Sequence, residues 1–208
     1  MQVVFNENSH SFISSSFVTI FIGVLCILAN LEKDFKLNLR QTFLFSTLAW
    51  VTVAFFGSLP FLLSNQYFSF SDAFFESMSG ITTTGATIIS DLDNSPKSIL
   101  LWRAIMQWLG GIGIVVMAIT ILPLLKVGGM QLFKMEGPDS TEKILPRTIE
   151  VAAIIISTYV ILTMICGLFY WMFGMTIFDS ICHAMTTIAT GGFSTHNDSI
   201  GFFKNSNI

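Results

Sequence analysis

The fold is decided by a stretch that occurs twice, DAFFESMSGITTTGAT (72–87) and, 107 residues further on, DSICHAMTTIATGGFS (179–194). The two copies align without a gap and are identical at five of sixteen positions. These identical pairs are Asp72/Asp179, Met78/Met185, Ile81/Ile188, Thr83/Thr190 and Gly85/Gly192. Each copy begins with a short apolar segment and ends in a run rich in Thr and Gly. An internal repeat of this length predicts a protein built from duplicated units.

The sequence around the repeat is too apolar for a soluble domain. Hydrophobic residues make up 52% of the chain and charged residues 11%, against about 25% charged in soluble domains. A membrane-spanning helix needs ~20 apolar residues, and four segments are long enough: 11–31, 42–63, 98–125 and 148–173. We therefore predict an all-α integral membrane protein. Arg103 lies near the start of the third segment, and we expect its long side chain to extend to the membrane surface.

The short apolar segments at 71–82 and 178–188 cannot cross a membrane, because twelve helical residues cover only about 18 Å. We predict that both are re-entrant helices. Each is followed by non-helical chain, which is tolerated at membrane depth only when it is buried in protein or lines a wet cavity. The expected architecture is therefore a repeated helix–pore-loop–helix unit like that of potassium channels.

Four regions follow from this pattern. Residues 1–35 form an N-terminal helix and basic linker, and residues 36–126 form the first complete unit. Residues 127–147 form a polar linker, which is the longest expected cytoplasmic surface. Residues 148–208 form a second unit without its second helix, so we expect a truncated form of the architecture.

The basic residues predict the orientation of the chain. The linkers 31–41 and 126–147 hold seven of the ten Lys and Arg residues, so the positive-inside rule places both in the cytoplasm. Both short helices then enter from outside. The N-terminus is also placed outside, and we expect a further helix before it in longer relatives. The net charge of −3 and the absence of a basic block argue against binding to nucleic acid.

The Thr/Gly loops have the chemistry of a cation filter. A cation that leaves water needs oxygens in place of its hydration shell, and backbone carbonyls from several loops can supply them. Glycine permits the required backbone angles, and threonine adds a hydroxyl oxygen. The C-terminal end of each short helix carries partial negative charge and points at its loop. Ser71, Asp72 and Asp179 are candidate N-caps of these helices. One such loop alone is equally compatible with a polar turn, whereas two aligned loops favour a filter.

At this point the sequence resembles a known family, the Trk/Ktr/HKT superfamily of potassium transporters, and within it most closely the bacterial TrkH branch. The resemblance rests on SDAFFESMSGITTTGAT (71–87), ILLWRAIMQWLGGIGIVVMAITILPLLKVGGMQLF (99–133) and IATGGFSTHNDSIGFF (188–203). Members carry four such units around one pore, and each unit contributes one filter strand. The resemblance implies that potassium is coordinated by backbone oxygens of Thr83, Thr84 and Gly85 in the first strand and of Thr190, Gly191 and Gly192 in the second.

The resemblance also implies partners and a location. It implies membrane lipid, a homodimer, a cytoplasmic nucleotide-binding regulatory subunit (TrkA-like) and the bacterial inner membrane. The third and fourth units do not occur in this chain, so two or more chains assemble, a separate polypeptide supplies the missing half, or the chain is a non-functional remnant. These three alternatives stay open from sequence.

Several other residues have two interpretations. Glu76 aligns with His183, and each is either a functional ionisable group at membrane depth or an anchor of its short helix. Gln107 either packs or lies near the pore. Gly110, Gly111 and Gly113 permit close helix packing. The charged residues beyond the loops either raise the local cation concentration or are plain solvated loop charges, and we expect the second, at the outer mouth: Asp91, Asp93, His196 and Asp198.

A different class of function is an intramembrane hydrolase, which requires a nucleophile and a base together at depth. The only deep candidates are Ser77, Ser79, Glu76 and His183. No hydrolase motif accompanies them, so we expect that the protein is not an enzyme.

Overall fold

The computed structural model describes residues 7, 10–30, 39–64, 68–125 and 141–204, and within these ranges it is helical and contains no strand. The predicted all-α fold is therefore confirmed. The helices are α2 (His10–Ala29), α3 (Leu39–Leu62), α4 (Phe70–Ile81), α5 (Lys97–Leu125), α6 (Thr141–Met172) and α7 (Ile177–Ile188), followed by the 3₁₀ helix η2 (Ser199–Phe203). The linkers at 31–38 and 126–140 lie outside the described residues.

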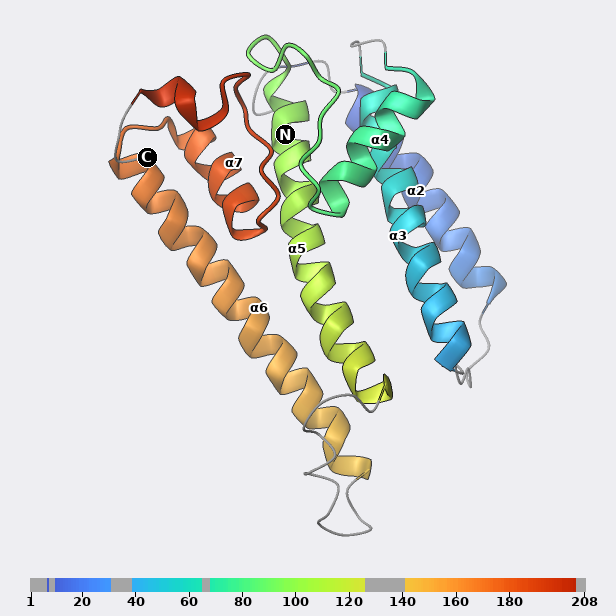
Figure 1. Ribbon diagram of the computed structural model, residues 1–208. Helices are drawn as coiled ribbons and strands as arrows, with labels where there is room; N and C mark the ends of the chain where they lie inside the picture. Colours follow the sequence, from blue (N-terminus) through green and yellow to red (C-terminus); the bar gives the residue numbers. More distant parts are fainter. Residues whose placement is uncertain (1–6, 8–9, 31–38, 65–67, 126–140, 205–208) are drawn as a thin grey trace.

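Four of these helices are long and apolar enough to cross a membrane, as predicted: α2, α3, α5 and α6. The helix α6 begins at Thr141, within the predicted linker 127–147, and its apolar span begins at Glu150. The short helices α4 and α7 both lie at the same end of the long helices (Figure 1). This common end agrees with two units that enter the membrane from one side.

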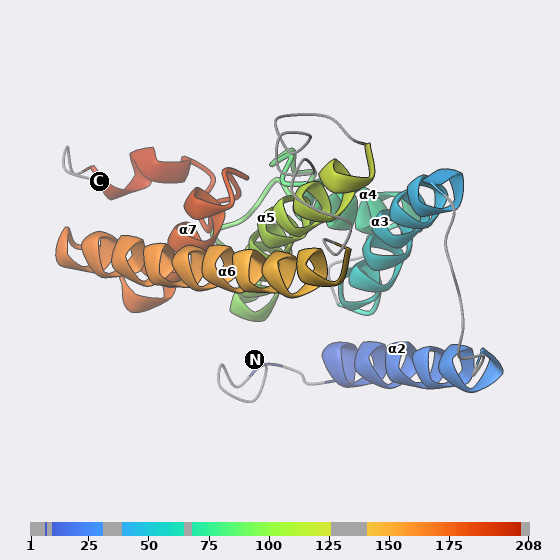
Figure 2. The ribbon, with the colours of Figure 1, turned by 90° about the horizontal axis from the view of Figure 1, so that it is seen from below.

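The helix α5 is the centre of the described structure. It lies between the pair α3/α4 and the pair α6/α7 (Figure 1). Of its apolar span 39% is buried, whereas none of the apolar span of α6 is buried. Figure 2 shows that α2 lies to one side of the other helices, and it contacts α3. The side chains of α5 are therefore the ones placed to contact both repeated units.

Small residues of α5 permit this central position. A Cβ atom on Gly110 would lie 2.0 Å from the carbonyl oxygen of Ile81, the last residue of α4. A Cβ atom on Gly111 would lie 3.1 Å from the Cα of Ala189, which follows α7. Adjacent glycines thus bring one helix against the C-terminal ends of both short helices. The predicted role of these glycines in close packing is confirmed.

The short helices begin up to one turn earlier than their predicted caps. The N-cap of α4 is Ser69 and that of α7 is Thr176, and both side chains accept a hydrogen bond from the backbone of the Asp three residues later. The predicted caps Ser71, Asp72 and Asp179 were therefore wrong. Asp72 instead completes a capping box, since its carboxylate accepts from the Ser69 N–H.

The buried core lies where α3, α4 and α5 meet. Its members are Ala54, Phe61, Ala73, Ile81, Ile99 and Met106. In a membrane, such a core gains little from the hydrophobic effect, because lipid is as apolar as the helices. The packing of small and aromatic side chains, together with the polar contacts described below, therefore fixes the position of α4.

Candidate functional site

The two Thr/Gly loops have the same backbone conformation. Thr83 and Thr190 both have φ 55°, and Gly85 and Gly192 have φ 79° and 80°. Each short helix closes in the same way, with the N–H of Thr84 donating to Ser79 and the N–H of Gly191 donating to Thr186, both at 2.9 Å. The repeat read from the sequence is therefore also a repeat in three dimensions.

A threonine with positive φ is strained, because a β-branched side chain fits this region poorly. Such strain persists only where surrounding contacts determine the backbone, and it concentrates at functional sites. Its occurrence at the same position of both loops, Thr83 and Thr190, indicates that this backbone shape is required in both.

The two loops lie against each other. A Cβ atom on Gly85 would lie 2.0 Å from the carbonyl oxygen of Gly191 and 3.2 Å from its carbonyl carbon. Only glycine allows this approach of backbone to backbone. Thr84, Thr190 and Gly192 are exposed at the loop surfaces, whereas Gly191 is buried.

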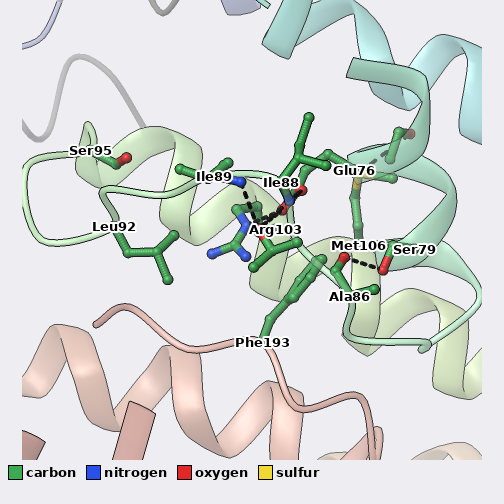
Figure 3. A network of polar contacts seen from close by, with 12 residues as sticks. Glu76, Ser79, Ala86, Ile88, Ile89, Leu92, Ser95, Arg103, Met106 and Phe193 are labelled. Atoms are coloured by element: carbon green, nitrogen blue, oxygen red, sulfur yellow. Dashed lines mark hydrogen bonds and ion pairs between the residues drawn. The ribbon is translucent and has the colours of Figure 1, made fainter. Parts of the chain in front are cut away.

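The first loop is held by a buried ion pair, which Figure 3 shows. The carboxylate of Glu76 on α4 accepts hydrogen bonds from the Thr87 hydroxyl (2.9 Å) and the Ile88 N–H (3.1 Å). It also pairs with the Arg103 Nε at 2.7 Å, and the two side chains are 0% and 1% exposed. Glu76 therefore anchors its helix to the loop, as one of the two interpretations predicted.

Arg103 does not extend to the membrane surface, so that expectation was wrong. Its charge is balanced by Glu76, its Nη1 donates to the Ser194 carbonyl at 3.0 Å, and its guanidinium carbon lies 4.1 Å from the centre of the Phe193 ring. These contacts compensate the loss of water, which an isolated buried charge cannot do. Its Nη2 has no hydrogen-bond partner within the described part of the chain.

Gln107, one turn further along α5, also contacts the second loop. Its side-chain Nε2 donates to the Gly191 carbonyl at 3.0 Å, and its Oε1 accepts from the Phe193 N–H at 3.1 Å. A carbonyl oxygen has two lone pairs, so Gly191 retains one acceptor site. Gln107 is thus buried and bonded to the second loop, and its place near a pore stays a prediction.

The second loop repeats the anchor of the first. His183 on α7 has its Nε2 3.0 Å from the Ser194 hydroxyl and its Nδ1 2.8 Å from the Asp179 carbonyl oxygen. Shifted by 107 residues, the Glu76–Thr87 contact becomes the His183–Ser194 contact. Both aligned ionisable groups are therefore anchors between a short helix and its own loop.

Beyond the Thr/Gly runs, the two loops are joined by Asp93 and His196. The Asp93 carboxylate lies 2.6 Å from the His196 Nδ1, and the His196 ring stacks on Phe202 with centroids 3.6 Å apart. This hydrogen bond is the main reason why the pKa of Asp93 is lowered from its ordinary value. These two residues are partners across the loops, and the Asp93 side chain remains 41% exposed, as predicted for a solvated charge, whereas His196 is 17% exposed.

The serines proposed for a hydrolase are not paired with a base. The Ser77 hydroxyl donates to the Ala54 carbonyl and the Ser79 hydroxyl to the Ala86 carbonyl, both at 2.5 Å. Glu76 is held by Arg103. The candidate nucleophiles of that alternative are thus engaged in fixing the backbone of α4 and its loop.

The chemistry available to a cation at the loops is that of backbone and hydroxyl oxygens. Within the described residues no group of three or more His, Cys, Asp or Glu side chains is arranged to hold a metal. The structure brings Gly85 and Gly191 into contact and gives Thr83 and Thr190 one conformation. Sequence reasoning missed the role of Arg103, although two polar residues one turn apart in an apolar helix, Arg103 and Gln107, were an available signal.

Comparisons with known proteins identify the family. The family model described as "TrkH: Cation transport protein" matches residues 8–208. The Trk system potassium uptake protein TrkH of Vibrio parahaemolyticus is 47% identical over 195 residues, which is 92% of this chain and 40% of that protein. TrkH of Escherichia coli K12 is 45% identical, with 95% of this chain and 42% of that protein covered.

A solved structure agrees with these sequence matches. The crystal structure of the potassium transporter TrkH from Vibrio parahaemolyticus superposes with a TM-score of 0.83 at 43% identity, covering 95% of this chain and 40% of that one. The chain thus spans about two fifths of the length of the relatives that it matches. The resemblance noted in the sequence is confirmed, and the chain belongs to the TrkH family of cation transport proteins.

Proposed function

We propose that this chain takes part in potassium uptake across the bacterial cytoplasmic membrane, with its two Thr/Gly loops as two sides of an ion filter. Backbone oxygens of Thr83, Thr84, Gly85, Thr190, Gly191 and Gly192 replace the hydration shell of potassium. The observation that carries this proposal is the shared, strained backbone of two adjacent loops. Such a duplicated strain is expected where two strands present carbonyls to one ion.

Electrostatics supports a cation at this place. Both α4 and α7 end directly at their loops, so the partial negative charge of two helix C-termini is directed at the same region. The buried Glu76 is neutralised by Arg103 rather than by the ion. The names of the relatives, which are potassium uptake proteins, agree with the choice of potassium.

Two loops enclose an ion on part of its circumference only. Since the chain spans about two fifths of the length of its relatives, we propose that further filter loops of the same kind complete the ring of oxygens around the ion. A homodimer and a TrkA-like nucleotide-binding regulatory subunit belong to the same proposal. The competing proposal is that the chain is inactive by itself.

Rubidium uptake in bacteria that lack their own potassium uptake tests the proposal. The chain is expressed alone and together with the C-terminal part of a relative, and its membrane insertion is verified. Uptake that is lost in Gly85→Asp supports the filter, with Gly201→Asp as the control, because a Cβ atom on Gly201 meets nothing within 4 Å. Uptake only with the added polypeptide shows that more loops are required. Unchanged uptake in Gly85→Asp contradicts the filter assignment.

A further inference from the structure

The two loops are held in different ways. The first loop is bonded to its own short helix, through Glu76 to Thr87 and Ile88 and through Ser79 to Ala86. The second loop makes two such contacts with its own short helix, between His183 and Ser194 and from the Thr195 hydroxyl to the Asp179 carboxylate. In addition, its backbone is bonded by side chains of α5, which belongs to the first unit.

The contacts from α5 cover the second loop over four residues. Gln107 bonds both the Gly191 carbonyl and the Phe193 N–H, and Arg103 bonds the Ser194 carbonyl. Residues four apart on a helix lie on one face, so the two side chains act from one surface of α5. The loop backbone is thus bonded to a rigid helix on both sides of Gly192.

A difference between the two loop sequences fits this arrangement. At the position where the first loop has Thr84, the second has Gly191. A Cβ atom at residue 191 would lie 2.3 Å from the Gln107 Cδ and 2.4 Å from its Oε1. The amide of Gln107 therefore occupies the volume that a side chain at 191 would need.

We infer that Gln107 is a specificity-determining positioning residue, which orients the Gly191 carbonyl and the following peptide in the second loop from the neighbouring unit. The expected effect of Gln107 on ion selectivity rests on the proposed filter function. Selection of potassium over sodium depends on the size of the site and on the number and field strength of its carbonyls, and a fixed arrangement of the loop sets all three. A loosened second loop loses its fixed carbonyl arrangement and admits sodium more readily.

The test compares Gln107→Leu, which keeps most of the volume and removes both hydrogen bonds, with the wild-type chain. The first measurement is amide hydrogen exchange in lipid nanodiscs, followed for residues 189–196 and 82–89. We expect exchange of the Phe193 amide to become roughly tenfold faster, as loss of one hydrogen bond predicts, with no change in residues 82–89. Leu109→Ala on the exposed face of α5 is the control.

The second measurement is inhibition of rubidium uptake by sodium in the assembly that transports. We expect sodium to inhibit Gln107→Leu at a severalfold lower concentration than wild type. Absence of uptake in wild type would contradict the proposed function, while the exchange measurement would still decide the role of Gln107. Unchanged exchange at Phe193 in a folded Gln107→Leu chain would overturn the inference.

Two variants separate positioning from space filling. Gln107→Glu keeps the oxygen that accepts from Phe193 and removes the donor to Gly191, so we expect the exchange of residue 193 to stay slow and sodium inhibition to increase. In the double variant Gly191→Ala/Gln107→Ala, removal of the Gln107 amide makes room for the new methyl group at residue 191. We therefore expect its melting temperature to be higher than that of Gly191→Ala. We also expect fast exchange of the Phe193 amide, because its acceptor is gone. Slow exchange in that double variant, or loss of the fold in both Gln107→Leu and Gln107→Glu, would show a merely structural role.

Discussion

Replacing Glu76 by Gln keeps the shape of the side chain and leaves Arg103 without its counterion. Both side chains are buried, at 0% and 1% exposure, and the pair distance is 2.7 Å. Breaking a buried pair from one side typically costs about 3–5 kcal/mol. Arg103 keeps its hydrogen bond to the Ser194 carbonyl and its contact with the Phe193 ring. The amide introduced at residue 76 still offers an oxygen that can accept hydrogen bonds from the loop. We therefore expect the free energy of unfolding to fall by an amount near the lower end of this range, about 3 kcal/mol.

The assay is reversible unfolding of the purified chain in mixed micelles, with the free energy of unfolding extrapolated to zero denaturant. Glu150→Gln, an exposed carboxylate on α6, is the control and is expected to change little. The double variant Glu76→Gln/Arg103→Met removes the unpaired charge, so it should recover much of the loss. A loss below about 1 kcal/mol in Glu76→Gln would refute the reasoning, because it would mean that water reaches the pair.

Three further perturbations follow from the structure. Gly85→Ala should abolish rubidium uptake, since its methyl group would meet the carbonyl of the adjacent loop at 2.0 Å, whereas Gly192→Ala, with open space at Cβ, should reduce uptake less. Gly110→Ala should lower the melting temperature clearly, because its methyl group would lie 2.0 Å from a backbone oxygen at the end of α4. The hydrogen bond from His196 lowers the pKa of Asp93 below the ordinary 3.8, so it adds stability above that pH. This stability is lost as pH falls through the lowered pKa, and Asp93→Asn should flatten the decline of melting temperature between about pH 5 and pH 3.

Each of these three perturbations has a control variant or an outcome that would contradict it. Equal loss of uptake in both loop-glycine variants would mean that the positive φ, which they share, matters more than the contact between loops. For α5 the comparison is Gly113→Ala, whose methyl group meets only the Trp50 side chain, at 3.3 Å. Equal melting temperatures of the two α5 variants would contradict the close approach. A decline with pH that is unchanged in Asp93→Asn would show that other carboxylates control it.

Much of the fold was predictable because a membrane simplifies the problem. Spanning helices must be about 20 apolar residues long, so composition and length located α2, α3 and α5 within a few residues, whereas α6 begins well before its predicted apolar segment, at Thr141. The Thr/Gly runs ended the short helices, and the repeat identified the equivalent positions of both units. The caps were misplaced by up to one turn because Ser and Thr upstream compete with Asp for the same role.

The contacts between units were not predictable in the same way. Alignment placed Glu76 over His183, but it gave no sign that α5 would lie between α4 and α7. Arg103 was expected at the membrane surface because an isolated charge in lipid is costly. That expectation failed because residues far apart in the chain, Glu76 and Ser194, supply its partners.

The class of protein, the spanning helices of the described residues and the repeat of the two Thr/Gly loops could all be derived from the amino-acid sequence, since they follow from local length, polarity and backbone preference. The tertiary structure alone decided which helix supports which loop. That choice depends on hydrogen bonds between atoms of different units, such as the one of 3.0 Å from Gln107 to Gly191. Such contacts arise only when the adjacent glycines of α5 allow both short helices to approach one helix.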